Sequence, residues 1–563
     1  MAAFEPPLNY DRLSESRQSF VQKAMHLDPK EAITEFTNLA GFQSMTSESM
    51  RDACELQDKD TEMLSEIFTR QAEENDPQSV TRDFLLGTLY LPPHLIPFMG
   101  DLEYIPDELI TTVTENLMGP VTQFFDQEDL ERKSKCLKIA FQYLAKRIEC
   151  DPSSELTLQL ADLAIRTNNI SPCLNNPGDP LKDLMANRAA VFTFILENYK
   201  MGREVEPIAE KGRIGILCSH VGQGDCTLYA LALLESLSDE GLEPLFICDS
   251  AIATSIQKKA EDLAGRTILL PKGIKEAAQL VYDLRLETLI FTDGVHNSGN
   301  PAFLLALQNL APNQAVIQST ILTTGFPHLS SLLVSENSLD KEELLTENAI
   351  PIEGLASMCC VELPAIEEEH PITKEELMIS EDDLVFISAA SPGSISPQTR
   401  EAWMSLLKQI PEAKLLLTPF LDASILEGER ENFVATMEHS AVQAGVSRNR
   451  LLIMNDILGT VYHLDACLAV SKIYLEAFPC NTLFPAARAL KEGLPVVTIK
   501  GNTMREKSTA VLLEEQGLNN MIATSTEEYL QIASELASSK TRVQIKTVSL
   551  KPLADAVSRL MAS

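Results

Sequence analysis

The sequence predicts an α/β protein with two successive Rossmann-like domains, preceded by an all-helical N-terminal region. Three observations support this prediction. Short apolar runs alternate with helical patterns from Arg213 onward, the alternation restarts after a Glu- and Pro-rich stretch, and strand patterns are scarce before Arg213. With 563 residues, the chain is long enough for two or three domains with separate cores. We expect domains at residues 1–205, 206–375 and 376–563.

The N-terminal region shows apolar residues at three- and four-residue spacing, for example in Leu64–Phe68 and Cys136–Leu144. This spacing places an apolar stripe along one side of a helix. A loop rich in Asn, Pro and Gly at 175–180 interrupts the pattern before a last predicted helix, Met185–Tyr199. Residues 1–205 are therefore expected to be helical.

Strand and helix patterns then alternate, which predicts a parallel, doubly wound sheet. The first strand is followed by a loop that contains Gly222 and Gly224 and by a helix. Two glycines without a third are a weak signal for a dinucleotide site. The expected strands of this first sheet are Ile214–Cys218, Glu243–Cys248, Thr267–Leu270, Thr288–Thr292, Ala315–Gln318 and Leu332–Val334.

A second unit of the same kind follows a segment rich in Glu and Pro at 362–377, which is long for a loop inside a compact domain. Two such sheets leave a cleft between their carboxyl edges, where ligands of this architecture bind. The expected strands of the second sheet are Leu384–Ser388, Lys414–Thr418, Leu451–Met454, Ile473–Leu475 and Pro495–Ile499.

The composition restricts the partners and the location. A formal net charge of −35 argues against nucleic acid, whose binding needs clustered Lys and Arg. The eleven cysteines have no metal-type spacing, which predicts a reduced compartment and no metal. The N-terminus lacks the basic start and apolar core of a secretory signal, and no apolar run approaches ~18 residues. We expect a cytoplasmic protein that is not bound to a membrane.

The C-terminal half carries the most specific motif. The run Ile473–Asn481 and the following run Ala486–Thr503, with Gly-Leu-Pro-Val-Val-Thr at its centre, resemble the second-domain core of O-GlcNAc transferases, and Leu512–Leu518 continues the likeness. Leu310–Ala315 resembles a strand-leading segment of the same family. Ser171–Pro172 and Asn187–Ala190 resemble the bacterial cytoplasmic N-glycosyltransferases that modify adhesins.

This resemblance implies a GT-B fold. It also implies a metal-independent transfer of a hexose or N-acetylhexosamine from a nucleotide-sugar, such as a UDP-sugar, to a protein side chain. The implied partner is a protein acceptor or a partner transferase, and a homo-oligomer stays open. Transfer needs positive charge or N–H donors on the leaving pyrophosphate and polar groups around the nucleoside and sugar.

Several donor-side positions depart from the family pattern. Ser394 stands where the family has a phosphate-binding Lys, and Ser391 belongs to the same serine-rich loop, which is either an anion nest or a plain loop. Asn481 and Thr482 lead into a turn that is apolar here, and Arg488 stands where the family has a ribose-binding Asp. A hydroxyl does not replace a charge.

Five further residues are candidates, and for all but Asp225 there is also a structural interpretation. His220 matches an active-site His of the bacterial N-glycosyltransferases or caps its loop, whereas the O-GlcNAc transferase position falls on Gly224. Asp225 is expected to orient an acceptor. His463 lies near a uridine-contact position or is simply packed on a helix. Arg505 and Lys507 either supply positive charge that binds the donor phosphates or lie at an exposed helix start.

Two functions follow from these residues. The first is an active protein glycosyltransferase with altered donor contacts. The second is a catalytically degenerate GT-B protein that acts as an acceptor-binding subunit, chaperone or scaffold, because fold and motif order establish ancestry more firmly than chemistry.

Overall fold

A computed structural model of the chain describes residues 10–37, 56, 58–97, 99–119, 127–167, 181–202 and 206–562, the last range with gaps at 220, 222–223, 249–253, 296–299, 320, 340–343, 361–372, 374–375, 378, 381–382, 421–426 and 455–460. The chain forms two compact units. Unit 1 consists of Met1–Pro120 and Glu128–Asn168, and unit 2 consists of Val121–Gln127 and Asn169–Ser563.

Unit 1 is helical in its described residues, as predicted. Its longer helices are α1 (Tyr10–Met25), α2 (Pro29–Thr37), α4 (Asp58–Glu73), α5 (Pro77–Thr88), α6 (Asp107–Met118), α7 (Gln127–Cys150) and α8 (Glu155–Thr167). Helix α5 shows why these boundaries arise from the sequence: the Asp76 carboxylate accepts a hydrogen bond from Ser79 N, and Pro77 occupies the first turn, where no N–H partner is needed. Phe36, Phe84 and Phe141 are buried in this unit.

Helix α9 (Lys182–Asn198) belongs to unit 2, together with both sheets. Its buried Arg188 stacks over the rings of Phe192 in the same helix and of Phe303 in α13 (Pro301–Ala306), at 5.6 and 4.5 Å from the ring centroids. These contacts attach α9 to the first sheet domain, although it was expected as the last helix of the region 1–205.

The first sheet has seven parallel strands in the order β3-β2-β1-β4-β5-β6-β7. Successive strands are added on one side of β1 up to β3 and on its other side from β4 onward, which gives the doubly wound arrangement that strand–helix alternation predicts. Its elements are β1 (Ile214–Leu217), α10 (Asp225–Asp239), β2 (Leu245–Cys248), α11 (Thr254–Leu263), β3 (Arg266–Leu269), α12 (Ile274–Asp283), β4 (Thr288–Phe291), β5 (Asn313–Ile317), β6 (Ser331–Ser335), β7 (Asn348–Ile352) and the short helix η5 (Ala356–Cys360).

The second sheet repeats this topology with six strands in the order β10-β9-β8-β11-β12-β13. Its switch point lies between β8 and β11, which pair in parallel. Its elements are β8 (Leu384–Ser388), α14 (Pro397–Gln409), β9 (Ala413–Leu417), α15 (Glu427–Ala444), β10 (Leu451–Ile453), α16 (Val461–Ala469), β11 (Ile473–Leu475), α17 (Leu483–Lys491), β12 (Val496–Ile499), α18 (Met504–Gln516), β13 (Ile522–Ala523) and α19 (Thr526–Ser538).

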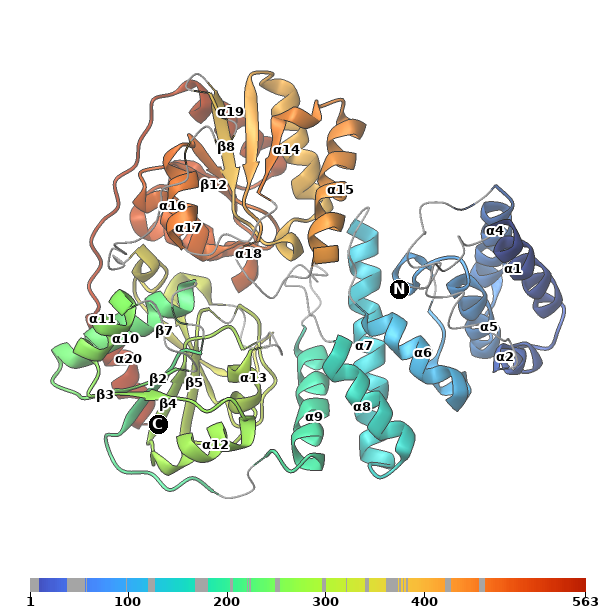
Figure 1. Cartoon of the computed structure of the whole chain (residues 1–563), viewed down its shortest axis with the longest axis horizontal. Helices are drawn as coiled ribbons and strands as arrows, with labels where there is room; N and C mark the ends of the chain where they lie inside the picture. Colours follow the sequence, from blue (N-terminus) through green and yellow to red (C-terminus); the bar gives the residue numbers. More distant parts are fainter. Residues whose placement is uncertain are drawn as a thin grey trace, which may run out of the picture. The chain divides into compact units, whose positions relative to one another are not determined.

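The C-terminal helix α20 (Lys551–Ala562) packs on the first sheet domain, against α10 and β7. Figure 1 shows the extended segment that runs from α19 in the second sheet domain to α20. Ser236 Oγ in α10 donates to the Leu550 carbonyl at 2.6 Å and accepts from Ala554 N at 3.1 Å. The end of the chain thus returns to the first sheet, which the expected division at residue 375 does not anticipate.

Contacts also join the two sheet domains directly. Glu515 at the end of α18 accepts from Ser335 Oγ at 2.6 Å and from Ser357 N at 2.7 Å. A continuous buried apolar cluster runs from α10 through η5 to α17 and α18. The two sheet domains are therefore one compact unit with a shared core.

Candidate functional site

The carboxyl edge of the second sheet carries most of the predicted donor-side residues. The loop after β8 contains Ser391, which is exposed, and Ser394, which is buried. Their hydroxyl oxygens lie 3.0 Å apart, and Ser394 Oγ lies 3.9 Å from Cys480 Sγ in the loop after β11. The Ser394 hydroxyl thus contacts Ser391 and Cys480, which belong to the same sheet domain.

A buried carboxyl group, Glu476, lies at the carboxyl end of β11. Its oxygens accept from the hydroxyls of Thr482 and Thr509, each at 2.7 Å, and from Ala477 N at 3.0 Å. Burial raises the pKa of Glu476 to about 7, against these hydrogen bonds, which lower it. This carboxyl group therefore keeps its proton to a higher pH than an ordinary glutamate does.

Asn481 and Thr482 connect this network to α17 and α18. The Asn481 backbone N–H donates to the Arg505 carbonyl at 2.8 Å, and its side-chain amide donates to the Ala477 carbonyl at 3.2 Å. Thr482 is the N-terminal cap residue of α17, but its hydroxyl bonds to Glu476 instead of to a backbone N–H of the first turn. Both side chains therefore hold the loop in place.

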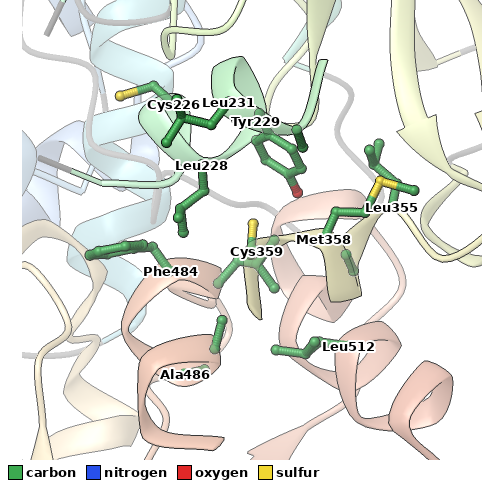
Figure 2. Packing of buried hydrophobic residues seen from close by; sticks show 14 of the residues in the cluster. Cys226, Leu228, Tyr229, Leu231, Leu355, Met358, Cys359, Phe484, Ala486 and Leu512 are labelled. Carbon is green, nitrogen blue, oxygen red and sulfur yellow. The ribbon is translucent and has the colours of Figure 1, made fainter. Parts of the chain in front are cut away.

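The first turn of α17 is apolar and buried. Leu483 and Phe484 are 6% and 9% exposed, and Pro485 has no backbone N–H. Figure 2 shows Phe484 in a cluster with Leu228 of α10 and Cys359 of η5, so that apolar side chains from both sheet domains meet here. The helix start therefore contributes to the core between the domains.

Arg488 lies on the buried side of α17, where it is 3% exposed. Its guanidinium forms a bidentate ion pair with Asp465 of α16, with Nε donating to Oδ1 at 2.9 Å and Nη2 donating to Oδ2. His463 is half-buried on the same helix α16. Helices α16 and α17 pack together, so this pair fastens one to the other.

Arg505 and Lys507 open α18, and both are buried rather than exposed. Lys507 Nζ donates to the Leu339 carbonyl of the first sheet domain at 2.8 Å. Glu506 caps the helix by accepting from the backbone N–H groups of Asn502 and Thr503 at 2.9 and 3.1 Å. The alternative of an exposed helix start is therefore wrong for these two residues.

On the first sheet domain, Asp225 is the first residue of α10 and follows Gly224, whose φ of 114° favours glycine. Loss of water around the Asp225 carboxylate raises its pKa to about 6, against the backbone N–H groups of Asp225 and Cys226, which lower it. His220 lies outside the described residues, so its role as a catalytic or loop-capping residue stays a prediction.

The structure thus brings Ser391, Ser394, Asn481, Thr482 and Arg505 to one edge of the second sheet. Arg488 and His463 lie on the neighbouring helix pair. The sequence analysis missed three polar residues of this region, Glu476, Asp465 and Thr509. A signal existed for Glu476, because it directly follows a buried parallel strand.

Two doubly wound domains within one compact unit, with a shared junction, define the GT-B class of fold. Residues 311–553 match the model of glycosyl transferase family 41. The chain is 25% identical over 283 residues to a protein of Arabidopsis thaliana named probable UDP-N-acetylglucosamine–peptide N-acetylglucosaminyltransferase SPINDLY, covering 50% of this chain and 29% of that protein. The protein of the same name from Hordeum vulgare is 26% identical over 296 residues, covering 50% and 28%.

A solved O-GlcNAc transferase mutant from Thermobaculum terrenum matches with a TM-score of 0.51 and 17% identity, over 90% of this chain and 94% of that one. The chain is thus O-GlcNAc transferase-like and has the GT-B fold. It spans less than a third of the length of the SPINDLY proteins that it matches. The described helices include none that is both long and apolar enough to cross a membrane.

Proposed function

We propose that this chain is a catalytically degenerate, O-GlcNAc transferase-like protein. Its role is to bind a protein, as an acceptor-binding subunit, chaperone or scaffold for a partner transferase. The observation that carries this proposal is the first turn of α17, where Leu483 and Phe484 fill the junction between the sheet domains instead of facing it with polar groups.

The physical argument concerns the leaving pyrophosphate. A helix start can hold phosphate through its free N–H groups, but Pro485 removes one donor, and the side chains of Leu483 and Phe484 in the same turn are apolar and buried. Ser394 offers a hydroxyl where the family has a Lys. Losing one charged contact to the transition state costs about 2 to 4 kcal/mol, or roughly 10²- to 10³-fold in rate, so several losses together suppress turnover.

The remaining charged residues of this region also support a catalytically degenerate protein. Arg488 stands at the expected ribose-binding position, and Asp465 neutralises it inside the protein. The Glu476 carboxyl lies beside the start of α17, where its ionised form would repel a pyrophosphate. Both features support a structural use of these polar groups.

An active transferase is the second candidate, and two observations favour it. The SPINDLY proteins carry a transferase name, and Arg505 and Lys507 place two buried basic side chains at the start of α18. In this case the chain moves a hexose or N-acetylhexosamine, without a catalytic metal, from a nucleotide-sugar to a cytoplasmic protein. The donor would then be held from α18 rather than from α17.

Nucleotide binding separates the two candidates. We would titrate the full chain with UDP, GDP, UDP-N-acetylglucosamine, UDP-glucose and GDP-sugars by calorimetry and by thermal shift. A ligand at about 100 times its Kd stabilises a protein by about 2.7 kcal/mol, so millimolar ligand detects even weak sites. We expect no heat and no shift.

A nucleotide that binds, together with transfer of labelled sugar to a protein, would contradict the proposal. If binding is lost in Lys507→Met but kept in Lys500→Met, the donor is held from α18 and the second candidate stands. Lys500 is a matched control because it lies just before α18 and pairs with Glu514 at the surface.

Partner binding tests the positive half of the proposal. The net charge of −35 favours a partner surface rich in Lys and Arg. We would capture partners from the source cell on the full chain and repeat the capture at high salt. Recovery of a transferase or of its protein substrate, weakened by salt, is expected, and failure to recover either would count against this role.

A further inference from the structure

The first sheet domain holds a second cluster of reactive side chains, at its own switch point. Cys218 directly follows β1, Asp293 lies just beyond β4, and Cys226 is in the first turn of α10. Strands β1 and β4 are parallel neighbours, so their carboxyl ends meet at one place. All three side chains are buried, and one ligand atom from each lies within 4.8 Å of the other two.

These separations suit a tetrahedral metal ion. Bonds of about 2.3 Å to sulfur and about 2.0 to 2.2 Å to oxygen place tetrahedral ligand atoms roughly 3.5 to 3.8 Å apart. The three ligand atoms, at no more than 4.8 Å, therefore need to close by about 1 Å at most. Two thiolates and one carboxylate suit zinc or a similar borderline ion, whereas Mg²⁺ and Ca²⁺ prefer oxygen ligands throughout.

The carboxylate of this set is already oriented. Asp293 Oδ2 accepts from Ser219 N at 2.8 Å, and Oδ1 accepts from Ser219 Oγ at 2.8 Å and from Asn300 Nδ2 at 3.2 Å. Asn300 in turn caps α13 by accepting from Ala302 N at 2.8 Å. Metal-binding carboxylates are commonly held in this way by outer hydrogen bonds, which fix their orientation.

We propose that Cys218, Cys226 and Asp293 bind one zinc-type divalent cation, with water in the fourth position. On binding, each thiol loses its proton to solvent and forms a thiolate–metal bond, and no electrons are transferred. The ion joins the end of β1 to the start of α10. It thereby anchors the start of α10, which carries Asp225, whatever the outcome for nucleotide binding at the other sheet. The proposed ion, with three protein ligands, differs from the metal-free expectation drawn from cysteine spacing.

The test uses the full chain purified under reducing conditions. We expect about one zinc ion per chain by elemental analysis, removable by a chelator. Titration of the metal-free protein with Co²⁺ should give a thiolate-to-cobalt charge-transfer band that Zn²⁺ abolishes. Asp293→Asn should weaken Zn²⁺ binding by about 10-fold or more, since a carboxylate ligand is lost.

A pair of cysteine variants localises the site. Cys226→Ala should lose the metal and the band, whereas Cys467→Ala should keep both, because Cys467 is a buried cysteine in α16 of the second sheet domain. If Cys226→Ala does not fold, the cobalt spectrum of the unaltered chain still shows whether thiolates of the protein bind a metal ion. No metal and no cobalt band would overturn the proposal, as would a band that survives in folded Cys226→Ala. A Cys218–Cys226 disulfide in metal-free protein that takes up no cobalt after reduction would also overturn it.

Discussion

Arg488 and Asp465 form a bidentate ion pair between α17 and α16, and the arginine side chain is only 4% exposed. Arg488 stands where related transferases are expected to hold the donor ribose, yet its charge is used inside the protein. The pair holds α16 and α17 together, so its loss is expected to lower the stability of the protein.

Arg488→Met should lower the free energy of unfolding by about 2 to 4 kcal/mol. Removal of one partner leaves the Asp465 carboxylate largely buried without its counter-charge. Urea denaturation checks this value. Arg448→Met is the control, because the Arg448–Glu438 pair is exposed on both sides and should change stability by less than about 0.5 kcal/mol. Equal effects of the two substitutions would contradict a structural role for the buried pair.

Phe484→Ala should lower the free energy of unfolding by about 2 to 4 kcal/mol, because it opens a cavity between α17, α10 and η5. Phe484→Leu keeps most of the volume and should cost about 1 kcal/mol. Leu269→Ala, at a side chain that is 53% exposed, should stay within about 0.5 kcal/mol of the unaltered chain. A loss of less than about 1 kcal/mol in Phe484→Ala would mean that this junction is loosely packed.

Glu476→Gln should change how stability depends on pH. The folded pKa of about 7 lies above the ordinary value of 4.5, so the folded state binds more protons than the unfolded state between these values. The contribution of Glu476 to stability is therefore fully present below about pH 4.5 and is lost as pH rises through about 7. This loss amounts to about 3 kcal/mol. A glutamine has no charge to bury, and it pairs with both Thr482 and Thr509 when one of the two hydroxyls accepts from its NH2 group instead of donating.

Chemical denaturation from pH 5 to 8 measures this effect. The stability of Glu476→Gln relative to the unaltered chain should increase with pH and level off near pH 8. Glu535→Gln, at a side chain hydrogen-bonded to Gln531 on the surface of α19, serves as the control. Parallel curves for the Glu476 variant and the unaltered chain would show that Glu476 is ionised throughout this range.

Glu515→Ala should lower the free energy of unfolding by about 2 kcal/mol. It removes the carboxylate that accepts from Ser335 Oγ and Ser357 N of the first sheet domain. These two donors then lose their hydrogen bonds to Glu515. Glu514→Ala is the adjacent control, because Glu514 pairs with Lys500 near the surface and should cost less than about 1 kcal/mol. Urea denaturation of both variants, with limited proteolysis of the segment between the sheets, would reveal whether Glu515 joins the domains.

Local patterns in the chain predicted both sheets except for one edge strand of each, β7 and β13. Buried parallel strands such as Ile473–Leu475 read as short apolar runs because helices cover both faces of the sheet. The helices between them follow from their own periodicity and caps, as in α14, where Ser396 Oγ accepts from Thr399 N. Strand β7 was missed because Asn348–Ile352 contains a proline and lies at the sheet edge.

The candidate site was predicted only in part. Ser394, Asn481 and Thr482 do lie at one sheet edge, since the carboxyl ends of parallel strands meet there. The pairing of Arg488 with Asp465 was not foreseeable, because it depends on how α16 packs against α17. Cys218, Cys226 and Asp293 were missed for a similar reason: their spacing in sequence has no metal signature, and β4 brings the third side chain.

The sequence by itself determined the succession of strands and helices along the chain, the two doubly wound domains and the likeness to O-GlcNAc transferases. These features depend on local periodicity and on contiguous motifs. Only the tertiary structure decided how the polar and apolar residues of those motifs are used. Phe484 and Arg488 acquire their roles from residues of other helices, Leu228 and Asp465. Their burial, and thus the strength of each contact, depends on how the helices and sheet domains pack together.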